Sequence, residues 1–243
     1  MSDLKRQVPI LIALEGNISS GKSTLLEWFK DDNDIKILPE PIGNWTNIGQ
    51  EDLLALKYDN SKRWEFTFQI QCDLSRLIQL RDTQFCGQSR IIERSLFSAH
   101  KIFVQMQKDS GDLSLVESEV LSTWANHVTS SNNGTLVKPD LFLYLKADPS
   151  ICWSRMNMRN RQAERTVTLS YLQSLHELHE KVFVTEAATL PASVVVLDGN
   201  LDENDMPTNV LEALAAIDMA KAKKAREEEV LEAFMRELST EAK

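Results

Sequence analysis

The stretch ILIALEGNISSGKS (residues 10–23) decides the fold, because a short apolar run leads directly into a glycine-rich turn. Within it, Gly16–Ser23 fits the pattern G-x-x-x-x-G-K-[ST], and Leu25, Leu26 and Phe29 follow with helical spacing. A strand, this loop and a helix in succession wrap the phosphates of a nucleotide with backbone N–H groups. The helix N-terminus adds partial positive charge at the same place. The sequence therefore predicts a nucleotide-binding α/β protein.

Further apolar runs have the composition of strands that are covered on both faces of a sheet. The predicted strands are Ile10–Leu14, Ile35–Leu38, Arg90–Glu93, Leu141–Leu145 and Val194–Leu197. The helical patterns between them are Ser61–Asp82, an apolar stripe at Val116, Val120, Trp124 and Val128, and Tyr171–Ala188. Strands that alternate with helices build a parallel sheet. We therefore expect an α/β fold with a doubly wound five-stranded parallel sheet flanked by helices.

The charge of the chain argues against one class of partner. The 243 residues include 27 Lys and Arg against 36 Asp and Glu, a formal net charge of −9. A nucleic acid polymer needs a net basic surface, so we expect none as a partner. A few local cations are enough to hold a single nucleotide.

The cysteines and the apolar runs indicate a compartment. Cys72, Cys86 and Cys152 lie too far apart in the sequence for a disulfide framework or a paired-cysteine zinc site. No run of eighteen apolar residues occurs, and MSDLKRQVP (residues 1–9) has neither a signal-peptide nor a transit-peptide pattern. We therefore expect a cytoplasmic protein with no membrane partner.

Three further elements bear on the class of nucleotide-binding protein. The D-x-x-G and N-K-x-D motifs of GTPases do not occur. The alternatives to a phosphotransferase are an ATPase that transfers no phosphate to a second substrate and a nucleotide-binding regulatory protein. Neither of them needs an acceptor site. Glu40 ends the second predicted strand ahead of Trp45, Glu93 and Arg94 end the third, and arginines gather within residues 155–165. These elements can supply such an acceptor site.

Five motifs follow one another along the chain: GNISSGKST, PEP…W, ERSLFSAHKIF, KPDLFLYLKADP and RNRQAERTVTLSYLQSLHELHE. With them, the chain from about Ile10 to Asp198 resembles the deoxyribonucleoside kinases, especially insect-type multisubstrate and mitochondrial thymidine kinase-like members. The resemblance implies a P-loop kinase with a lid, and a homodimer formed through Ser61–Asp82 and one of the next two helices. It also implies transfer of the γ-phosphate of ATP, with Mg²⁺, to the 5′-hydroxyl of a deoxyribonucleoside in nucleotide salvage.

The resemblance assigns roles on the nucleotide side. Lys22 would reach the β- and γ-phosphates, while Ser23 and, through water, Glu93 would hold Mg²⁺. Arg159 and Arg161 resemble lid arginines, whose forked, permanently charged groups suit phosphates. Arg155 joins them, faces the adenine or lies on the helix surface. The expected ATP-binding residues are Gly16, Asn17, Ile18, Ser19, Ser20, Gly21, Lys22, Ser23, Thr24, Arg155, Arg159 and Arg161.

The resemblance also assigns the acceptor side. Glu40 would be the general base that takes the 5′-hydroxyl proton, and Arg94 would orient Glu40 and the 5′-oxygen. Together with Lys22 they form the expected catalytic set. Tyr58 and Glu164 match the positions that hold the 3′-hydroxyl of the sugar.

The base pocket is expected to combine aromatic rings with one amide. Phe68 and Phe103 would sandwich the base, with Trp45 as a side wall. Gln69 would pair with the base edge, since an amide offers both a donor and an acceptor.

Two pocket positions depart from the thymidine kinase-like pattern. Cys72 and Arg76 stand where apolar residues usually line the pocket, and the position that would supply an aspartate partner for Arg76 is Ala99. An unpaired arginine there is costly unless it reaches solvent or ligand. Ala99 leaves room for a 5-methyl group, so we expect a pyrimidine preference with broad specificity. The competing functions are a nucleoside monophosphate kinase, which needs a second cationic site, and a regulator without turnover.

The last part of the chain carries a biased segment. We expect residues 1–205 to form the kinase domain and residues 206–243 to be a helical extension of it. In AKAKKAREEE (residues 220–229), basic residues precede acidic ones at helical spacing, which is typical of a solvated helix. The alternative is that the apolar residues from Val230 to Leu238 pack on the body or on a partner subunit.

Overall fold

Five strands form one parallel sheet. The structure is a computed structural model that describes residues 8–84, 86–130, 134–202 and 204–241. The strands are β1 (Leu11–Glu15), β2 (Ile35–Leu38), β3 (Ser89–Glu93), β4 (Leu141–Lys146) and β5 (Ser193–Asp198). Their order is β2-β3-β1-β4-β5, and all pairings are parallel. The predicted sheet is confirmed, and each strand end lies within one residue of its prediction.

Helices and short turns connect the strands. The helices are α1 (Lys22–Glu27), α2 (Leu53–Asp59), α3 (Ser61–Thr83), α4 (Leu96–Ser98), α5 (Gln105–Asp109), α6 (Leu115–Ser130), α7 (Gly134–Val137), α8 (Pro149–Arg159), α9 (Leu169–Glu180) and α10 (Met206–Glu241). The 3₁₀ turns are η1 (Ile42–Asn44), η3 (Gln162–Glu164) and η5 (Ala187–Thr189), and the π-helical turns are η2 (Ala99–Val104) and η4 (Lys181–Thr185).

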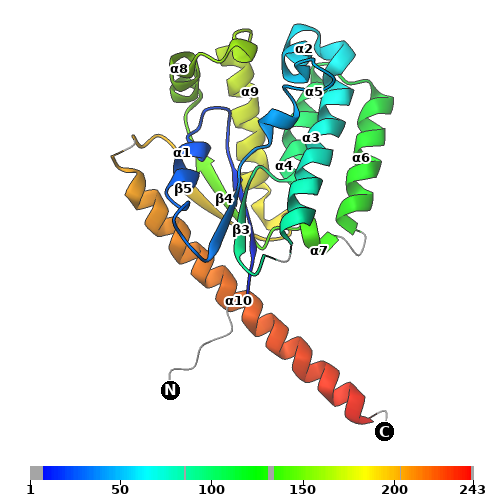
Figure 1. The fold of residues 1–243 in the computed structure, drawn as a ribbon, viewed down its shortest axis with the longest axis vertical. Helices are drawn as coiled ribbons and strands as arrows, with labels where there is room; N and C mark the ends of the chain where they lie inside the picture. Colours follow the sequence, from blue (N-terminus) through cyan, green and yellow to red (C-terminus); the bar gives the residue numbers. More distant parts are fainter. Residues whose placement is uncertain (1–7, 85, 131–133, 203, 242–243) are drawn as a thin grey trace.

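Helices cover both faces of the sheet (Figure 1). Successive residues of a strand point to opposite faces, so the apolar runs of β1 and β4 serve two cores. Ile12 and Leu143 belong to the core that includes residues of α1 and α10. Ala13 and Phe142 belong to the core that includes residues of α3 and α9. The sheet is therefore doubly wound, as predicted.

Two predicted helices differ in detail from those observed. The helix expected at residues 61–82 is α3, where the Asn60 side chain accepts a hydrogen bond from the Arg63 N–H. The helix expected at Tyr171–Ala188 begins earlier, because the Thr168 hydroxyl accepts from the Tyr171 N–H and caps α9. It also ends earlier as an α-helix, at Glu180, and continues as the π-helical turn η4.

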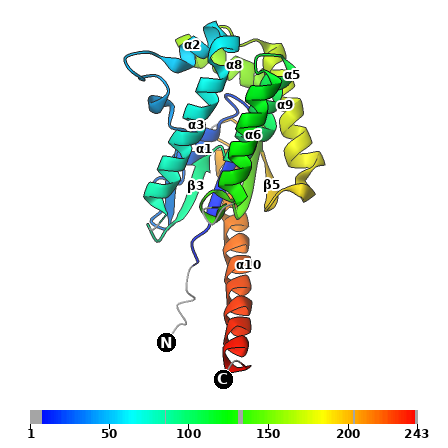
Figure 2. The same cartoon turned by 90° about the vertical axis from the view of Figure 1, so that its right-hand side faces the viewer.

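The apolar stripe of α6 is not buried along its length. Val116 and Val120 are 74% and 49% exposed, whereas Trp124 and Val128 are partly buried. Residues four apart advance by about 40° more than a full turn, so a stripe at this spacing winds around the helix. Leu121 instead anchors α6 to the body. Helix α6 lies beside α3 (Figure 2).

Helix α10 has one half on the body and one half beyond it (Figure 2). Ala213 and Ile217 are buried against the sheet. Lys224 Nζ donates to Asp140 Oδ2 at 3.0 Å and to the Pro9 carbonyl at 3.2 Å, at the amino ends of the strands. Past this contact, the apolar side chains at residues 230–238 are exposed. The alternative that they pack on the body is therefore wrong.

Two findings bear on membranes and thiols. Among the residues that the structure describes, no helix combines the length and the apolar character that crossing a bilayer requires. All three cysteines are free thiols, with Cys72 and Cys152 buried and Cys86 exposed.

Candidate active site

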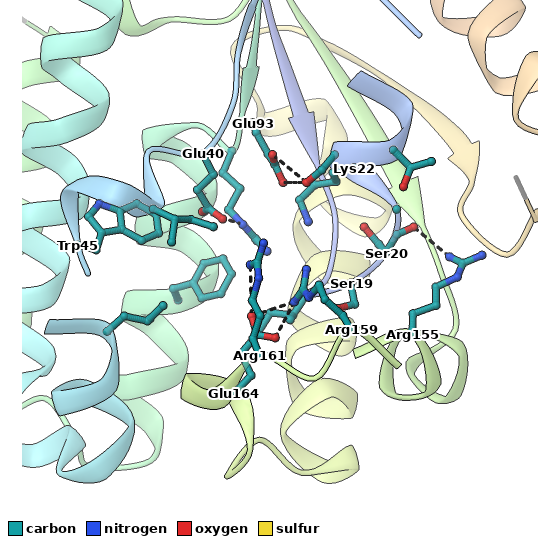
Figure 3. A pocket seen from close by; sticks show the side chains of 18 of the residues that line it. Ser19, Ser20, Lys22, Glu40, Trp45, Glu93, Arg155, Arg159, Arg161 and Glu164 are labelled. Carbon is teal, nitrogen blue, oxygen red and sulfur yellow. Dashed lines mark hydrogen bonds and ion pairs between the residues drawn. The ribbon is translucent and has the colours of Figure 1, made fainter. Parts of the chain in front are cut away.

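One cavity of about 560 Å³ lies at the carboxyl ends of the strands (Figure 3). Ligands of open α/β sheets bind at this edge. The cavity brings together every predicted site residue except Gly16 and Asn17, which are not among its lining residues. The predicted residues that line it are Ile18, Ser19, Ser20, Gly21, Lys22, Ser23, Thr24, Glu40, Trp45, Tyr58, Phe68, Gln69, Cys72, Arg76, Glu93, Arg94, Ala99, Phe103, Arg155, Arg159, Arg161 and Glu164.

The loop after β1 has the tight backbone that an anion cradle needs. Gly16 and Gly21 have φ of +152° and +103°, which side chains disfavour. A Cβ on Gly16 would lie 2.7 Å from the Leu145 carbonyl oxygen, so the loop can lie this close to β4 only without a side chain there. The backbone conformation of the loop therefore requires glycine at both positions.

Lys22 is buried at the base of this loop. Its Nζ donates to the carbonyl of Asn17 at 2.7 Å and to that of Gly16 at 3.3 Å. Asn17 is itself anchored, because its side-chain amide donates to the Leu172 carbonyl of α9. Burial lowers the pKa of Lys22 to about 8, and the nearby charge of Arg94 adds to the effect. The ammonium is thus poorly solvated and suited to an anionic ligand.

Two oxygen-bearing side chains meet beside Lys22. The Ser23 hydroxyl lies 3.3 Å from both carboxylate oxygens of Glu93, at the end of β3. Hydroxyl and carboxylate oxygens are ligands that Mg²⁺ accepts, and it commonly adds water and substrate phosphates. No group of three or more His, Cys, Asp or Glu able to hold a metal occurs among the described residues. The pair fits a magnesium ion shared with a phosphate rather than a site made by protein alone.

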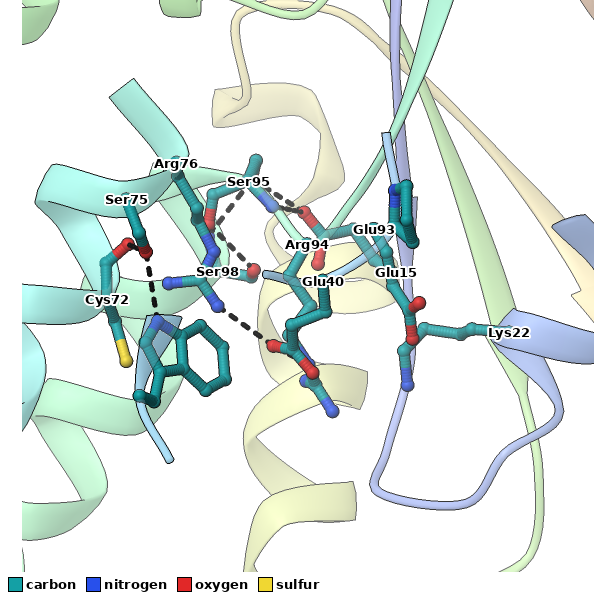
Figure 4. Close-up of polar contacts among 12 residues, drawn as sticks. Glu15, Lys22, Glu40, Cys72, Ser75, Arg76, Glu93, Arg94, Ser95 and Ser98 are labelled. Atoms are coloured by element: carbon teal, nitrogen blue, oxygen red, sulfur yellow. Dashed lines mark hydrogen bonds and ion pairs between the residues drawn. The ribbon is translucent and has the colours of Figure 1, made fainter. Parts of the chain in front are cut away.

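Glu40 lies between two arginines (Figure 4). Its Oε1 accepts from Arg76 Nη2 at 2.9 Å and lies 3.2 Å from Arg94 Nε. Burial alone would raise the pKa of Glu40, but Arg94, Arg76 and Lys22 outweigh it and hold that pKa below its usual range. The expectation that Arg76 lacks a protein partner is therefore wrong. With Ala99 in place of an acid, the guanidinium reaches across to the end of β2.

Arg94 has an uncommon backbone conformation. Its φ is +67°, in the left-handed region that favours glycine. From there its guanidinium reaches Glu40 and also lies over the ring of Phe103, 4.7 Å from the centroid. Non-glycine residues in this region cluster at functional sites.

Aromatic side chains form the wall beyond Glu40. Trp45 and Phe68 pack edge to face with centroids 5.6 Å apart, and the Trp45 indole donates to Ser75 Oγ at 2.9 Å. Phe103 and Ala99 also line the cavity and lie on η2, and π-helical turns are frequent at functional sites. This part of the cavity has the aromatic lining of a site for a planar ring.

Polar groups of α2 and α3 complete this wall. The Gln69 amide donates to Glu65 Oε1 at 2.7 Å, which fixes the orientation of its side chain. Lys57 Nζ lies 3.6 Å from Glu65 Oε2 and 4.4 Å from the centroid of the Tyr58 ring. Tyr58 thus sits at the cavity beside a buried ion pair.

The segment between α8 and α9 closes one side of the cavity (Figure 3). Arg159 Nη2 donates to both oxygens of Glu164, at 2.8 and 2.6 Å, and Arg161 Nη1 lies 3.6 Å from Glu164 Oε1. The two predicted lid arginines and the predicted sugar contact therefore form one cluster. A phosphate and Glu164 would compete for the same guanidinium groups.

Arg155 is not a helix-surface residue. Its guanidinium donates to the carbonyls of Ser20 at 3.2 Å, Gly199 at 2.6 Å and Leu201 at 2.7 Å. It joins the phosphate loop to the segment after β5 while lining the cavity.

Sequence reasoning missed several residues that line or support the cavity. Lys57, Tyr171 and Leu201 line it, and Glu65 and Glu15 support it from behind. Lys57 adjoins Tyr58 and Glu65 lies one helical turn before Gln69, so proximity to predicted residues was a usable signal. Glu15 was visible as an acid inside an apolar strand, a placement that requires partners.

Comparison with known proteins agrees with this arrangement. Residues 12–217 match the family model described as deoxynucleoside kinase. The chain is 36% identical over 190 residues to mitochondrial thymidine kinase 2 of Macaca fascicularis, covering 77% of this chain and 69% of that protein. It is 30% identical over 232 residues to deoxycytidine kinase of Mus musculus, covering 83% and 88%.

Proposed function

The chain belongs to the deoxynucleoside kinase family, and from that premise we propose that it transfers the γ-phosphate of ATP to the 5′-hydroxyl of deoxynucleosides in nucleotide salvage. One observation carries the proposal. The carboxylate of Glu40 lies in the same cavity as the phosphate loop, between Lys22 of that loop and Trp45 of the aromatic wall (Figure 3). A phosphate cradle, an acid and a ring site in this order suit a nucleoside acceptor.

Glu40 is the proposed general base. Both arginines contact its Oε1, and no hydrogen bond from a described residue reaches its Oε2. That second oxygen is free to accept the 5′-hydroxyl proton. The two arginines make Glu40 a weak base, which phosphoryl transfer tolerates because its loose transition state depends mainly on positioning and charge stabilisation.

The phosphates would lie along the loop and under the lid. Lys22, with its poorly solvated ammonium, and backbone N–H groups of the loop would hold them, and Arg159 and Arg161 would turn from Glu164 to neutralise their charge. When bound beside Ser23 and Glu93, Mg²⁺ would offset the negative charge of the β- and γ-phosphates. ATP as the donor and Mg²⁺ as the metal are both part of this proposal.

The nucleoside would lie between the aromatic wall and η2. Phe68 and Phe103 would flank the base, Gln69 would pair with its edge, and Tyr58 with Glu164 would bind the sugar. The small side chain of Ala99 supports acceptance of a 5-methyl group. A preference for pyrimidines with broad specificity is the proposal that this lining supports.

The test is a steady-state assay of the full chain with ATP, Mg²⁺ and each of the four natural deoxynucleosides. We expect 5′-monophosphates as products, and a loss of kcat of at least 100-fold in Glu40→Gln. No product from any deoxynucleoside would refute the function. Full activity of Glu40→Gln would refute the role of Glu40 as general base. Higher kcat/KM for both purines than for both pyrimidines would refute the specificity.

The same assay with deoxynucleoside monophosphates as acceptors separates the two kinase classes. On the acceptor side, Arg76 and Arg94 contact the proposed base Glu40 and Lys57 pairs with the buried Glu65, so none of these three cations is set apart for an acceptor phosphate. We expect no diphosphate product. A regulatory protein would bind ATP without forming any product.

A homodimer across α3 and α6 is the proposed assembly. Leu74 and Ile78 of α3 and Val116 and Val120 of α6 are exposed apolar side chains on neighbouring helices (Figure 2). Light scattering of the full chain should give twice the chain mass of 27.6 kDa. Val120→Asp should give the single mass, whereas the control Val230→Asp on α10 should not. A single mass for the unmodified chain would refute the dimer.

The proposed compartment is the cytoplasm, and the proposed domain boundary is residue 205. Free thiols, two of them buried, suit a reducing compartment. A fluorescent fusion of the full chain that concentrates in mitochondria would refute the first proposal. The burial of Ala213 and Ile217 supports residues 206–243 as an extension of the domain formed by residues 1–205.

A further inference from the structure

Glu15 is a fully buried acid that the proposed chemistry does not use. It ends β1, directly before the phosphate loop, and does not line the cavity. Its Oε1 accepts two hydrogen bonds from Ser95, one from the N–H at 2.9 Å and one from the hydroxyl at 2.5 Å (Figure 4). Burying a carboxylate costs free energy unless it is hydrogen-bonded. The bonds to Ser95 therefore explain how Glu15 is tolerated in an apolar strand, and they raise the question of what they hold in place.

The bonds to Ser95 fix the turn that connects β3 to α4. Ser95 Oγ also accepts from the Ser98 N–H at 3.2 Å, and the Ser98 hydroxyl donates to the Ser95 carbonyl at 3.0 Å. Ser95 is therefore both the N-cap of α4 and the group held by Glu15. Through it, the end of β1 determines where α4 begins.

Arg94 lies between β3 and this cap, in the left-handed conformation with φ of +67°. Such a backbone costs conformational energy and persists only where its surroundings hold it. The two hydrogen bonds that hold it both come from β1. The Arg94 N–H donates to the Leu14 carbonyl at 3.0 Å, and the next N–H, that of Ser95, donates to Glu15.

We propose that Glu15 is a positioning residue for phosphoryl transfer, whose carboxylate holds Arg94 through Ser95 in the conformation that directs the guanidinium onto Glu40. This inference rests on the proposed function, in which Glu40 is the base. Without Glu15, the backbone of Arg94 can relax toward negative φ. The guanidinium would then leave its positions 3.2 Å from Glu40 Oε1 and over the Phe103 ring.

The geometry uses Glu15 as a hydrogen-bond acceptor. The oxygen that bonds Ser95 is Oε1, while Oε2 has no hydrogen-bond partner among the described residues. Burial raises the pKa of Glu15, and the bonds from Ser95 oppose the rise. A glutamine keeps an acceptor oxygen at the same reach, whereas a leucine of similar size keeps none. The two substitutions therefore separate positioning from packing.

The experiment compares Glu15→Gln and Glu15→Leu with the unmodified full chain, measuring kcat, both KM values and the pH dependence of kcat. We expect Glu15→Leu to lower kcat at least tenfold, with both KM values within threefold. Its acid limb should move to higher pH, because Glu40 loses one of the cations that keep it ionised. Glu15→Gln should keep kcat within threefold and leave the acid limb in place.

Ser89→Ala is the matched control. The Ser89 hydroxyl is buried between the same two strands, at their amino ends, where it accepts from the Ile10 N–H at 3.3 Å. Its loss should lower the melting temperature without moving the acid limb. A Glu15→Leu variant that melts lower but keeps the kcat and acid limb of the unmodified chain would show that Glu15 is only structural, and would overturn the inference.

Should Glu15→Leu not fold, Ser95→Ala removes the hydroxyl bond to Glu15 from the other side. We expect a smaller shift of the acid limb in the same direction, and no shift would overturn the inference. Failure of the proposed function is separate, because it would appear as an unmodified chain that phosphorylates no deoxynucleoside.

Discussion

Arg76 Nη2 lies 2.9 Å from Glu40 Oε1, so a residue of the base pocket bonds directly to the carboxylate at the phosphate end of the cavity. The contact joins α3 to the end of β2. The guanidinium of Arg76 therefore takes part both in recognition of the nucleobase and in the ionisation of Glu40. A nucleobase that draws Arg76 toward itself would also change the environment of Glu40.

Arg76→Met should raise the pKa of Glu40 toward its usual value. Glu40 is active as the anion, and Arg76 favours the anion, so its removal should move the acid limb of kcat upward by about one pH unit, the scale of one charge-assisted hydrogen bond. The measurement is kcat between about pH 3.5 and 7, a range that spans the usual pKa of a glutamate. Arg76→Lys, which keeps the charge, should shift the limb less. An acid limb that stays in place in Arg76→Met would show that Arg94 alone holds Glu40 ionised.

Lys22 should give ATP use an alkaline limit. The pKa of Lys22 is lowered to about 8 and the ammonium form binds phosphate, so kcat/KM for ATP should fall about tenfold per pH unit above that value. The measurement is kcat/KM between pH 7 and 10. Lys22→Arg stays charged and should lose this limb even if its activity is lower. The same limb in Lys22→Arg would assign it to another group.

His179 should make the fold sensitive to acid. It is fully buried, its Nδ1–H donates to the Leu175 carbonyl at 2.6 Å, and burial lowers its pKa to about 3. The unfolded chain, with a pKa near 6.5, binds the proton first, so stability is full above pH 6.5 and falls as the pH drops toward 3. The expected loss from this group is roughly 2 kcal/mol between pH 6.5 and pH 5.

Urea unfolding at these two pH values measures the loss. His179→Gln should reduce the difference between them, although it lowers stability at both. The exposed His127 gives the control, since His127→Gln should leave the difference unchanged. An equal pH difference in His179→Gln and the unmodified chain would contradict the assignment.

Truncation of α10 should separate its two halves. Deleting residues 227–243 leaves the Lys224 bond to Asp140 intact, so the melting temperature should change by no more than about 2 °C. Deleting residues 213–243 removes Ala213, Ala216 and Ile217 from the core and should abolish cooperative unfolding. A large drop with the shorter deletion would show that the exposed half is covered in solution.

The elements that the sequence predicted well are those defined by local pattern. The strands and the loop from Gly16 to Ser23 each depend on neighbours in the chain, and they occur where expected. The Arg76–Glu40 contact joins residues 36 positions apart, in α3 and in the segment that follows β2, so it depends on how two elements approach. Because the sequence does not show this contact, we expected Arg76 to lack a protein partner, which is wrong.

Helical phase marks a second limit of the sequence. The apolar residues of α6 and of the end of α10 have regular spacing, yet Val116, Val120 and Val230 are exposed. Spacing identifies which residues share a face, and not which face meets the body. Arg155 shows a third limit. Its partners are backbone carbonyls, and because every residue has one, the sequence does not indicate which of them an arginine will contact.

The contact between Lys224 and Pro9 brings the first described residues and the middle of α10 together at one pole of the molecule, opposite the cavity. An affinity tag or surface tether attached through either end would therefore leave the cavity facing away from its support. Substrates could exchange freely while the protein is immobilised. The exposed half of α10 would serve as a rigid spacer of about 1.5 Å per residue between the support and the body.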